Sequence, residues 1–570
     1  MKKNFLGTIP LLACLSLLMD AFISEISGDQ LTGNENNCGC KPSLPIITKN
    51  IKTDFGAKGN NKQDDSFSFL AASDWLNKNC SDSFVLKLFI PNGTYLVGLQ
   101  VSPGQKFANP LNPGQSFVNK MGNTLEGITL FDLQKAKNII ISGDRNTIIK
   151  YKSGLPFGGF NAELQPVTYV PSNTLCSTTK DPRHFATLGT FLSMRNSSCI
   201  IIQQLLLDGN NSHMNLGGRY GECNGYEIGH DGIDIFGSKN ITIQNVSCDN
   251  FGRDGIMFCY ADGNPDSICL ENISCSKNSR QGISFTAGTN IKVVNGNFSK
   301  TGTVFYSNPG AGVDIEPESW GTCANISFTN CKFLDNRFCG LISDNHYPYV
   351  ADITFNDCEF SASHRDSWSI WTKRMIRTAF NNCIIRGRFT HVAGIDSTDR
   401  MKFNHCTITD WRRGPRDTLS AWGGYLVDFG AGPPDDHFYE FNYCNFEIHK
   451  TFAITTVEND SGNTERVFNH CNWKFYVDDL LKIIPPFPDT PTRGFLGRFM
   501  SCTFISNTFN ETSPSRKDKR LYFIEIDLHE NSTDSNNTFA PQNGLNGNKY
   551  CRVQNNPAWK YGYMLQLKDF

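Results

Sequence analysis

Short β-strands recur along most of the chain. The segments "KNITIQNVSC", "ANISFTNCKF" and "ADITFNDCEF" alternate apolar and polar residues, which is typical of strands, and clusters of Asn, Gly, Asp and Ser separate them. A cysteine stands at the same point of many of these phrases, mainly at spacings of 23 to 38 residues. A period of this size with several short strands per unit indicates a solenoid. The cysteines that mark the repeat are Cys248, Cys275, Cys331, Cys358, Cys383, Cys406, Cys444, Cys471 and Cys502.

Each repeat has room for roughly three short strands and their turns, at about 3.3 Å per residue. We therefore predict an all-β fold, a right-handed parallel β-helix in which each repeat forms one coil and buries its inner side chains against the next coil. We expect the coils to span residues 48–505, and the C-terminal end of the solenoid and a tail to occupy 506–570. The repeated cysteines should form a ladder of buried free thiols, whereas Cys38 and Cys40 could pair elsewhere.

A different pattern precedes the coils. In "DFGAKGNNKQDDSFSFLAASDWLNKN" two aspartates lead into apolar residues at helical spacing, and "FVLKLFIPNGTYLVG" then predicts two strands around a Pro-Asn-Gly turn. The helix should follow Asp64 and Asp65 and bury Phe67, Leu70 and Leu76. We expect it to cap the open end of the solenoid, where unpaired strand edges would otherwise aggregate.

The first residues, "MKKNFLGTIPLLACLSLLMDAFIS", place two lysines before an apolar run that Asp20 interrupts. This pattern predicts a signal segment over residues 1–28, followed by a linker over 29–47, and a run too short to span a membrane. We therefore expect a secreted, periplasmic or cell-surface protein, and a monomer. Lys plus Arg number 53 against 55 Asp plus Glu, a net charge of -2. This balance argues against nucleic acid or an anionic membrane as the main partner.

An acidic phrase occurs twice in "HDGIDIFGSKNITIQNVSCDNFGRDGIMF". Aligning the coils on the Gly-Ile step places Asp231 and Asp254 at one position of adjacent coils, about 4.8 Å apart. Like charges stacked so closely repel unless cations intervene, and this invites a functional explanation. On the same coils, the alignment gathers further polar candidates on the outer face: His230, Asp234, Arg253, Arg280, Gln281, Asp314 and Glu316.

Two stretches resemble the pectate-lyase-like superfamily of β-helix proteins, which includes rhamnogalacturonases, polygalacturonases, lyases, epimerases and phage tail spikes. These are the lead-in "DFGAKG…DD…FIPNGTYLV" and the phrase around "HDGID". By this resemblance, Asp231 matches the aspartate of the family's Asn-Thr-Asp, and Asp254 matches the second of its paired aspartates. Arg253 and Gln281 stand where the pectin hydrolases place an aspartate and a histidine.

The first hypothesis is a glycoside hydrolase acting on an acidic or pectin-like polysaccharide without a cofactor. Such an enzyme needs one carboxylic acid and one carboxylate, which we assign to Asp231 and Asp254, with Asp314 and Glu316 in reserve. Both arginines could clamp an acidic sugar, or could simply neutralise the neighbouring aspartates. We assign substrate binding to the arginines and to three further polar residues, and assign no metal ligand. The substrate-binding candidates are His230, Asp234, Arg253, Arg280 and Gln281.

Two other classes of function stay open. A polysaccharide lyase or epimerase would use Arg or His as the base, and Asp314, Glu316 and Asp344 could then supply oxygen ligands to Ca²⁺. A non-catalytic β-helix would bind a glycan through exposed aromatic rings, although these could equally cover the apolar bases of loops. The aromatic candidates are Trp320, Trp368, Trp371 and Trp411.

Overall fold

The computed structural model describes the greater part of the chain from residue 44 onward. The predicted signal segment, most of the predicted linker, Cys38, Cys40 and Trp411 lie outside the described residues. Among the described residues, no helix is long and apolar enough to cross a membrane. The described residues are 44–120, 122, 124–166, 185–217, 228–318, 320–344, 350–362, 367–373, 375–389, 399–409, 425–428, 437–448, 452–455, 464–476, 495–500, 502–507, 524–528, 538–541 and 551–553.

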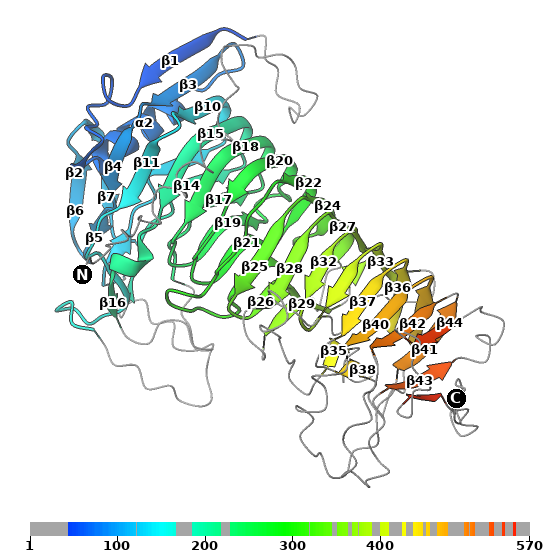
Figure 1. Ribbon diagram of the computed structural model, residues 1–570. Coiled ribbons are helices and arrows are strands. Elements are labelled where there is room, and N and C mark those ends of the chain that lie inside the picture. Colours follow the sequence, from blue (N-terminus) through cyan, green and yellow to red (C-terminus); the bar gives the residue numbers. More distant parts are fainter. Residues whose placement is uncertain are drawn as a thin grey trace, which may run out of the picture. The chain divides into compact units, whose positions relative to one another are not determined.

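Three long sheets run along the molecule, and successive coils add parallel strands to each of them (Figure 1). The sheet that carries the candidate residues has eight strands in chain order, and each pairs in parallel with the strands of the coils before and after it. We call it the ladder sheet. Its strands are β9 (Phe131–Gln134), β14 (Leu192–Arg195), β17 (Ile233–Phe236), β19 (Asp254–Cys259), β21 (Gln281–Phe285), β23 (Ala311–Ile315), β26 (Cys339–Asp344) and β29 (Trp368–Lys373).

The other two long sheets complete the coils. One also has eight strands: β25 (Lys332–Asn336), β28 (Glu359–Ala362), β32 (Ile384–Arg386), β34 (Thr407–Thr409), β37 (Asn445–Ile448), β40 (Asn472–Tyr476), β42 (Thr503–Asn507) and β44 (Thr538–Pro541). The largest has twenty: β1 (Ile46–Asn50), β2 (Asn60–Asp64), β3 (Val85–Ile90), β4 (Gly93–Val97), β10 (Lys137–Gly143), β11 (Thr147–Tyr151), β15 (Ser198–Asp208), β18 (Lys239–Asp249), β20 (Asp266–Ser274), β22 (Gly288–Val294), β24 (Cys323–Thr329), β27 (Val350–Asn356), β30 (Met375–Ile376), β31 (Ala379–Asn381), β33 (Met401–Asn404), β36 (His437–Asn442), β39 (Thr464–Asn469), β41 (Phe495–Met500), β43 (Ile524–Leu528) and β45 (Cys551–Val553).

Four small sheets lie beside the long ones. Two are antiparallel hairpin-like pairs, one is a parallel pair, and one has three strands. Their strands are β5 (Gln100–Val101) with β8 (Glu126–Gly127), β6 (Lys106–Asn109) with β7 (Asn112–Val118), β35 (Tyr425–Asp428) with β38 (Phe452–Thr455), and β12 (Pro156–Gly159) between β13 (Phe185–Ala186) and β16 (Asn215–Gly217).

The abundance of asparagine has a conformational cause. Single residues within the long strands β18 and β20 adopt the left-handed helical region, which asparagine tolerates better than most residues because its short polar side chain can hydrogen-bond locally. Asn240 and Asn245 have φ of 55° and 53°, and Asn272 on the next coil has φ of 55°. The repeat therefore carries its own turn chemistry.

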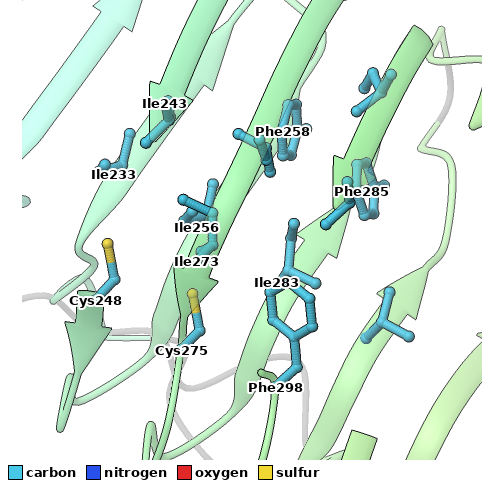
Figure 2. Close-up of a cluster of buried hydrophobic side chains, with 14 of the residues drawn as sticks. Ile233, Ile243, Cys248, Ile256, Phe258, Ile273, Cys275, Ile283, Phe285 and Phe298 are labelled. Carbon is cyan, nitrogen blue, oxygen red and sulfur yellow. The ribbon is translucent and has the colours of Figure 1, made fainter. Parts of the chain in front are cut away.

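Apolar residues form ladders inside the coils. Ile233 pairs in register with Ile256, which pairs with Ile283, and all three side chains are buried. Figure 2 shows these three isoleucines side by side on successive coils. The ladder continues through Val313 and Leu341, as predicted from the alignment on the Gly-Ile step. Each isoleucine that leaves water in this way contributes about 1.5–3 kcal/mol to stability, and this fixes the register of the coils.

The predicted cysteine ladder is confirmed. Cys383 and Cys406 each donate Sγ–H to a phenylalanine carbonyl of the preceding coil, at 3.4 and 3.3 Å. Burial also raises the pKa of Cys323, a buried thiol on β24, so this thiol stays protonated and unreactive. Cysteines Cys248, Cys275, Cys331, Cys358, Cys383, Cys406, Cys444, Cys471 and Cys502 are all buried and free.

The predicted capping helix is also present, as α2 (Ser66–Asn79). Asp65 precedes it, and its carboxylate accepts the backbone N–H groups of Lys58 at 2.6 Å and Gly59 at 3.0 Å, so it fixes the turn before the helix. Leu70 and Leu76 are buried, as expected, whereas Phe67 is only partly buried. The helix thereby covers apolar surface at the N-terminal end of the described solenoid.

Candidate functional site

The strand register brings the candidate residues onto neighbouring positions of the ladder sheet. Asp254 pairs with Gln281, which pairs with Ala311 on the following coil. Three residues further along, Asp234 pairs with Met257, Met257 with Ser284, and Ser284 with Asp314. Because Ile233 and Ile235 enter the core, alternation places Asp234 on the outer face of the sheet.

A bidentate ion pair holds Asp231. Arg253 donates from Nε to Oδ1 at 2.8 Å and from a terminal nitrogen to Oδ2 at 2.5 Å. The backbone N–H of Asp254 donates to the same Oδ1 at 3.0 Å. This carboxylate therefore has a cation and a backbone donor from the following coil, and it is buried. Burial would lower the pKa of Arg253, but the adjacent Asp231 charge raises it well above its usual range.

Asp254 repeats the arrangement one coil later. Arg280 donates from Nε to Oδ1 at 2.9 Å and from a terminal nitrogen to Oδ2 at 2.5 Å. Ser284 adds a hydroxyl hydrogen bond to Oδ2 at 2.9 Å. Each stacked aspartate is thus paired with an arginine from the next coil, and the cations relieve the repulsion expected between the two carboxylates.

In the structure, Arg253 and Arg280 neutralise the neighbouring aspartates. This is one of the two roles that the sequence left open for them, and the other is substrate binding. They are also less accessible than an outer face implies: the side chain of Arg253 is 16% exposed and that of Arg280 is 9% exposed. The predicted polar groups lie on the outer face of the sheet, but their side chains are largely shielded from solvent. Arg253 is the more accessible of the two cations.

Gln281 and Asp314 form the third step of the network. The amide nitrogen Nε2 of Gln281 donates to Oδ2 of Asp314, and both side chains are buried. Glu316 follows the end of β23 and is exposed. The two reserve carboxylates therefore differ, since one lies within the shielded network and the other faces solvent.

His230 is buried among aromatic rings. Its ring centroid lies 4.5 Å from that of Tyr151, 5.1 Å from Phe251 and 5.6 Å from Phe157. Nδ1 accepts the backbone N–H of Gly252 at 2.8 Å, and burial lowers the pKa of the histidine to about 3. His230 is consequently neutral at ordinary pH and lies out of reach of a substrate, so it orients the chain before Arg253 instead.

Asp234 has an unusual environment. Burial and the charge of Asp231 raise its pKa well above its usual range, and Thr190 donates a hydroxyl hydrogen bond to its Oδ2 at 2.7 Å. Its other oxygen, Oδ1, is buried and has no hydrogen-bond partner. Thr190 was not identified from the sequence. It lies before β14, on the preceding coil, and no sequence signal marks it, because the register partner of Asp234 on that coil is Ser193.

Among the described side chains, no group of three or more His, Cys, Asp or Glu residues is placed to hold a metal ion. The side chain of Asp344, one of the three calcium ligands considered, lies outside the described residues. Of the other two, Asp314 is bound to Gln281 and Glu316 is exposed.

One protein family matches part of the chain and agrees with this architecture. Residues 192–346 match the family described as the right handed beta helix region. No curated protein matches the sequence. Similar solved structures include the A-module of a mannuronan C-5 epimerase from Azotobacter vinelandii, 15% identical over 75% of this chain and 93% of that chain, with a TM-score of 0.40.

Two further solved structures are similar to a comparable degree, and one is an enzyme whereas the other is an adhesin. An exopolygalacturonase from Yersinia enterocolitica is 12% identical over 82% of this chain and 76% of that chain, with a TM-score of 0.38. The surface adhesin PfbA of Streptococcus pneumoniae is 12% identical over 75% of this chain and 92% of that chain, with a TM-score of 0.41. From its parallel sheets, its inward ladders and the family match, the chain is a right-handed parallel β-helix protein.

Proposed function

We propose that the protein is an exported enzyme that hydrolyses an acidic polysaccharide on the outer face of the ladder sheet. The observation that supports this proposal most directly is the contrast between Asp234 and Asp231. Asp234 has a raised pKa and a buried carboxyl oxygen with no hydrogen-bond partner, whereas Asp231 is paired with Arg253. Neighbouring carboxyl groups in different environments are what acid–base catalysis requires.

In this proposal Asp234 is the general acid. Burial and the charge of Asp231 raise its pKa, which favours the protonated carboxyl group that can give a proton to the leaving glycosidic oxygen. Thr190 holds the other oxygen and orients the group. Asp234 was assigned to substrate binding from the sequence, and the proposal moves it to the catalytic step because of its environment.

Arg253 links substrate recognition to the second carboxylate. A uronate or sulfate group of the glycan competes with Asp231 for the guanidinium, since both are planar or multidentate anions that suit its fork of donors. When the guanidinium turns to the substrate, Asp231 is released as the base or nucleophile. Asp254, held by both Arg280 and Ser284, stays in place and supports the network.

The test is an assay of glycan cleavage with Asp234→Asn. Wild-type protein and the variant are incubated with polygalacturonate, alginate and hyaluronan, and with neutral galactan, while reducing ends and the absorbance of unsaturated uronates are followed. New reducing ends without unsaturation, lost in the variant, support the hydrolase. Asp132→Asn is the matched control, because Asp132 lies on the same outer column of the ladder sheet, on β9, and is exposed.

The same assay separates the alternatives. Unsaturated products would indicate a lyase, whose base could not be the buried His230. No product from any glycan, with binding retained, would favour the non-catalytic β-helix. One observation supports that second candidate: the ion pairs of Asp231 and Asp254 already satisfy both carboxylates within the fold, so stability alone accounts for them.

A further inference from the structure

Two large aromatic side chains are exposed near the candidate site. Trp320 is 80% exposed and Tyr260 is 43% exposed, although most aromatic residues of the described coils are buried. Both follow strands of the ladder sheet: Tyr260 comes directly after β19, and Trp320 comes five residues after the end of β23. The other aromatic candidates differ, since Trp368 is buried and Trp371 is partly buried.

The turns that carry these rings are in contact. The backbone N–H of Thr322 donates to Oδ1 of Asn264 at 3.2 Å, which joins the turn of Trp320 to the turn of Tyr260. The backbone N–H of Glu318 donates to the carbonyl of Thr286 at 3.1 Å, so the turn of Trp320 also folds onto the intervening coil. Hydrogen bonds therefore fix the two turns relative to one another.

The turn of Tyr260 follows β19, the strand that pairs with β17, which carries Asp234. Cys259, which pairs with Phe236 and directly precedes Tyr260, is close enough to Asp234, Arg253 and Glu318 for their charges to act on its thiol. Burial, the largest effect, raises the pKa of that thiol to about 12. Cys259 is thus near Asp234, Arg253 and the turn of Trp320.

We propose that Tyr260 and Trp320 form a sugar-stacking subsite next to Asp234; this inference rests on the proposed function and specifies its substrate. Aromatic rings stack on the apolar face of a sugar ring and leave its hydroxyl groups free. Glu318 and Asp262, both exposed, lie on these turns, and their carboxylates repel a uronate but accept hydrogen bonds from hydroxyl groups. The acidic sugar is bound at Arg253, whereas the sugar on the aromatic rings is neutral. The substrate is therefore a mixed glycan in which neutral and acidic sugars are neighbours.

The experiment compares binding of a mixed and a uniformly acidic glycan. Oligosaccharides of hyaluronan, which alternate a neutral and an acidic sugar, and of polygalacturonate are titrated against wild type, Trp320→Ala, Trp320→Phe and Tyr260→Ala. Binding is followed by calorimetry and by tryptophan fluorescence. We expect tighter binding of the mixed glycan, about tenfold weaker binding in Trp320→Ala, and partial recovery in Trp320→Phe. Tyr443→Ala is the matched control, because Tyr443 is 52% exposed on distant coils.

The outcomes separate the subsite from the catalytic proposal. Weaker binding in Trp320→Ala, with unchanged binding in Tyr443→Ala, supports the subsite whether or not the glycan is cleaved. Cleavage by wild type with equal KM and equal fluorescence response in Trp320→Ala overturns the subsite and leaves the hydrolase standing. Tighter binding of polygalacturonate than of hyaluronan overturns the mixed substrate. Absence of binding to both glycans overturns the subsite as well.

Discussion

Two groups of coils share one backbone geometry and differ in what they place on it. The front coils, those of β17, β19, β21 and β23, carry different residues at equivalent outer positions: Asp234, Met257, Ser284 and Asp314. The rear coils, those of β31, β33, β36 and β39, repeat one phrase, Phe-Asn-x-Cys. Variation at equivalent positions therefore distinguishes the coils that could carry chemistry from those that only stack.

Because the phrase Phe-Asn-x-Cys repeats, identical side chains of successive rear coils contact one another. Phe380 stacks on Phe403 with ring centroids 4.7 Å apart and planes inclined by 5°. In the adjacent position, the side chain of Asn404 donates to Asn381 at 2.8 Å and accepts from Asn442 at 2.9 Å. Each of these side chains contacts an identical residue on the neighbouring coils. At the outer positions of the front coils this rule fails, and arginines compensate for stacked aspartates.

The largest effect is expected from removing one of these arginines. Arg280→Met leaves the buried Asp254 without its cation and should lower the free energy of unfolding by about 3–5 kcal/mol. Denaturant unfolding measures the loss. Arg386→Met is the matched control, because its ion pair with Glu359 is half-buried at 2.9 Å and should contribute about 0–1 kcal/mol.

A double variant sharpens this prediction. Asp254→Asn together with Arg280→Met removes both charges, and it should recover part of the stability lost in Arg280→Met. Equal losses in the free energy of unfolding of Arg280→Met and Arg386→Met would contradict the view that the front ion pairs are structurally required. A double variant no more stable than Arg280→Met would contradict it as well.

The second prediction concerns the dependence of stability on pH. His230 has a pKa of about 3 when folded and an ordinary value of 6.5, so folding disfavours its protonation. Its stabilising contribution is complete above pH 6.5 and is lost as the pH falls toward 3, by up to about 1.4 kcal/mol per pH unit. The free energy of unfolding of His230→Asn should therefore fall less steeply than that of wild type across this window. His213→Asn, at an exposed histidine, should keep the wild-type slope.

A smaller effect is expected in the rear coils. Asn404→Ala interrupts the amide ladder and leaves the half-buried side chains of Asn381 and Asn442 each without one partner. The loss should be about 1–2 kcal/mol by denaturant unfolding. Lys402→Ala, on the same strand but exposed, serves as the control. An undiminished stability of Asn404→Ala would show that the ladder adds nothing beyond the stacked core.

The smallest effect is expected at the surface of the rear coils. The ring of Tyr443 lies between those of His405 and His470, at centroid distances of 5.1 and 4.8 Å. Tyr443→Ala should cost about 0.5–1 kcal/mol, and Tyr443→Phe should cost less because it keeps both ring contacts. Thermal unfolding of the three proteins measures this. Equal losses in both variants would assign the effect to the hydroxyl group instead of the stacking.

The sequence by itself determined the architecture and the register of this protein. The period of the repeat and the alternation within it identified Ile233, Ile256 and Ile283 as an inward ladder, because each coil can bury apolar residues only against the next. The same periodicity identified the buried thiols, and it placed Asp254 against Gln281 and Asp234 against Met257.

Only the tertiary structure decided how the polar residues are used. Register fixes which positions are neighbours, but it does not fix side-chain conformation or access to water. It therefore could not show that Arg253 folds back onto Asp231, that aromatic rings enclose His230, or that Thr190 reaches Asp234 from another coil. The pKa of a carboxyl group depends on such burial and pairing, and these arise only when distant segments of the chain pack together.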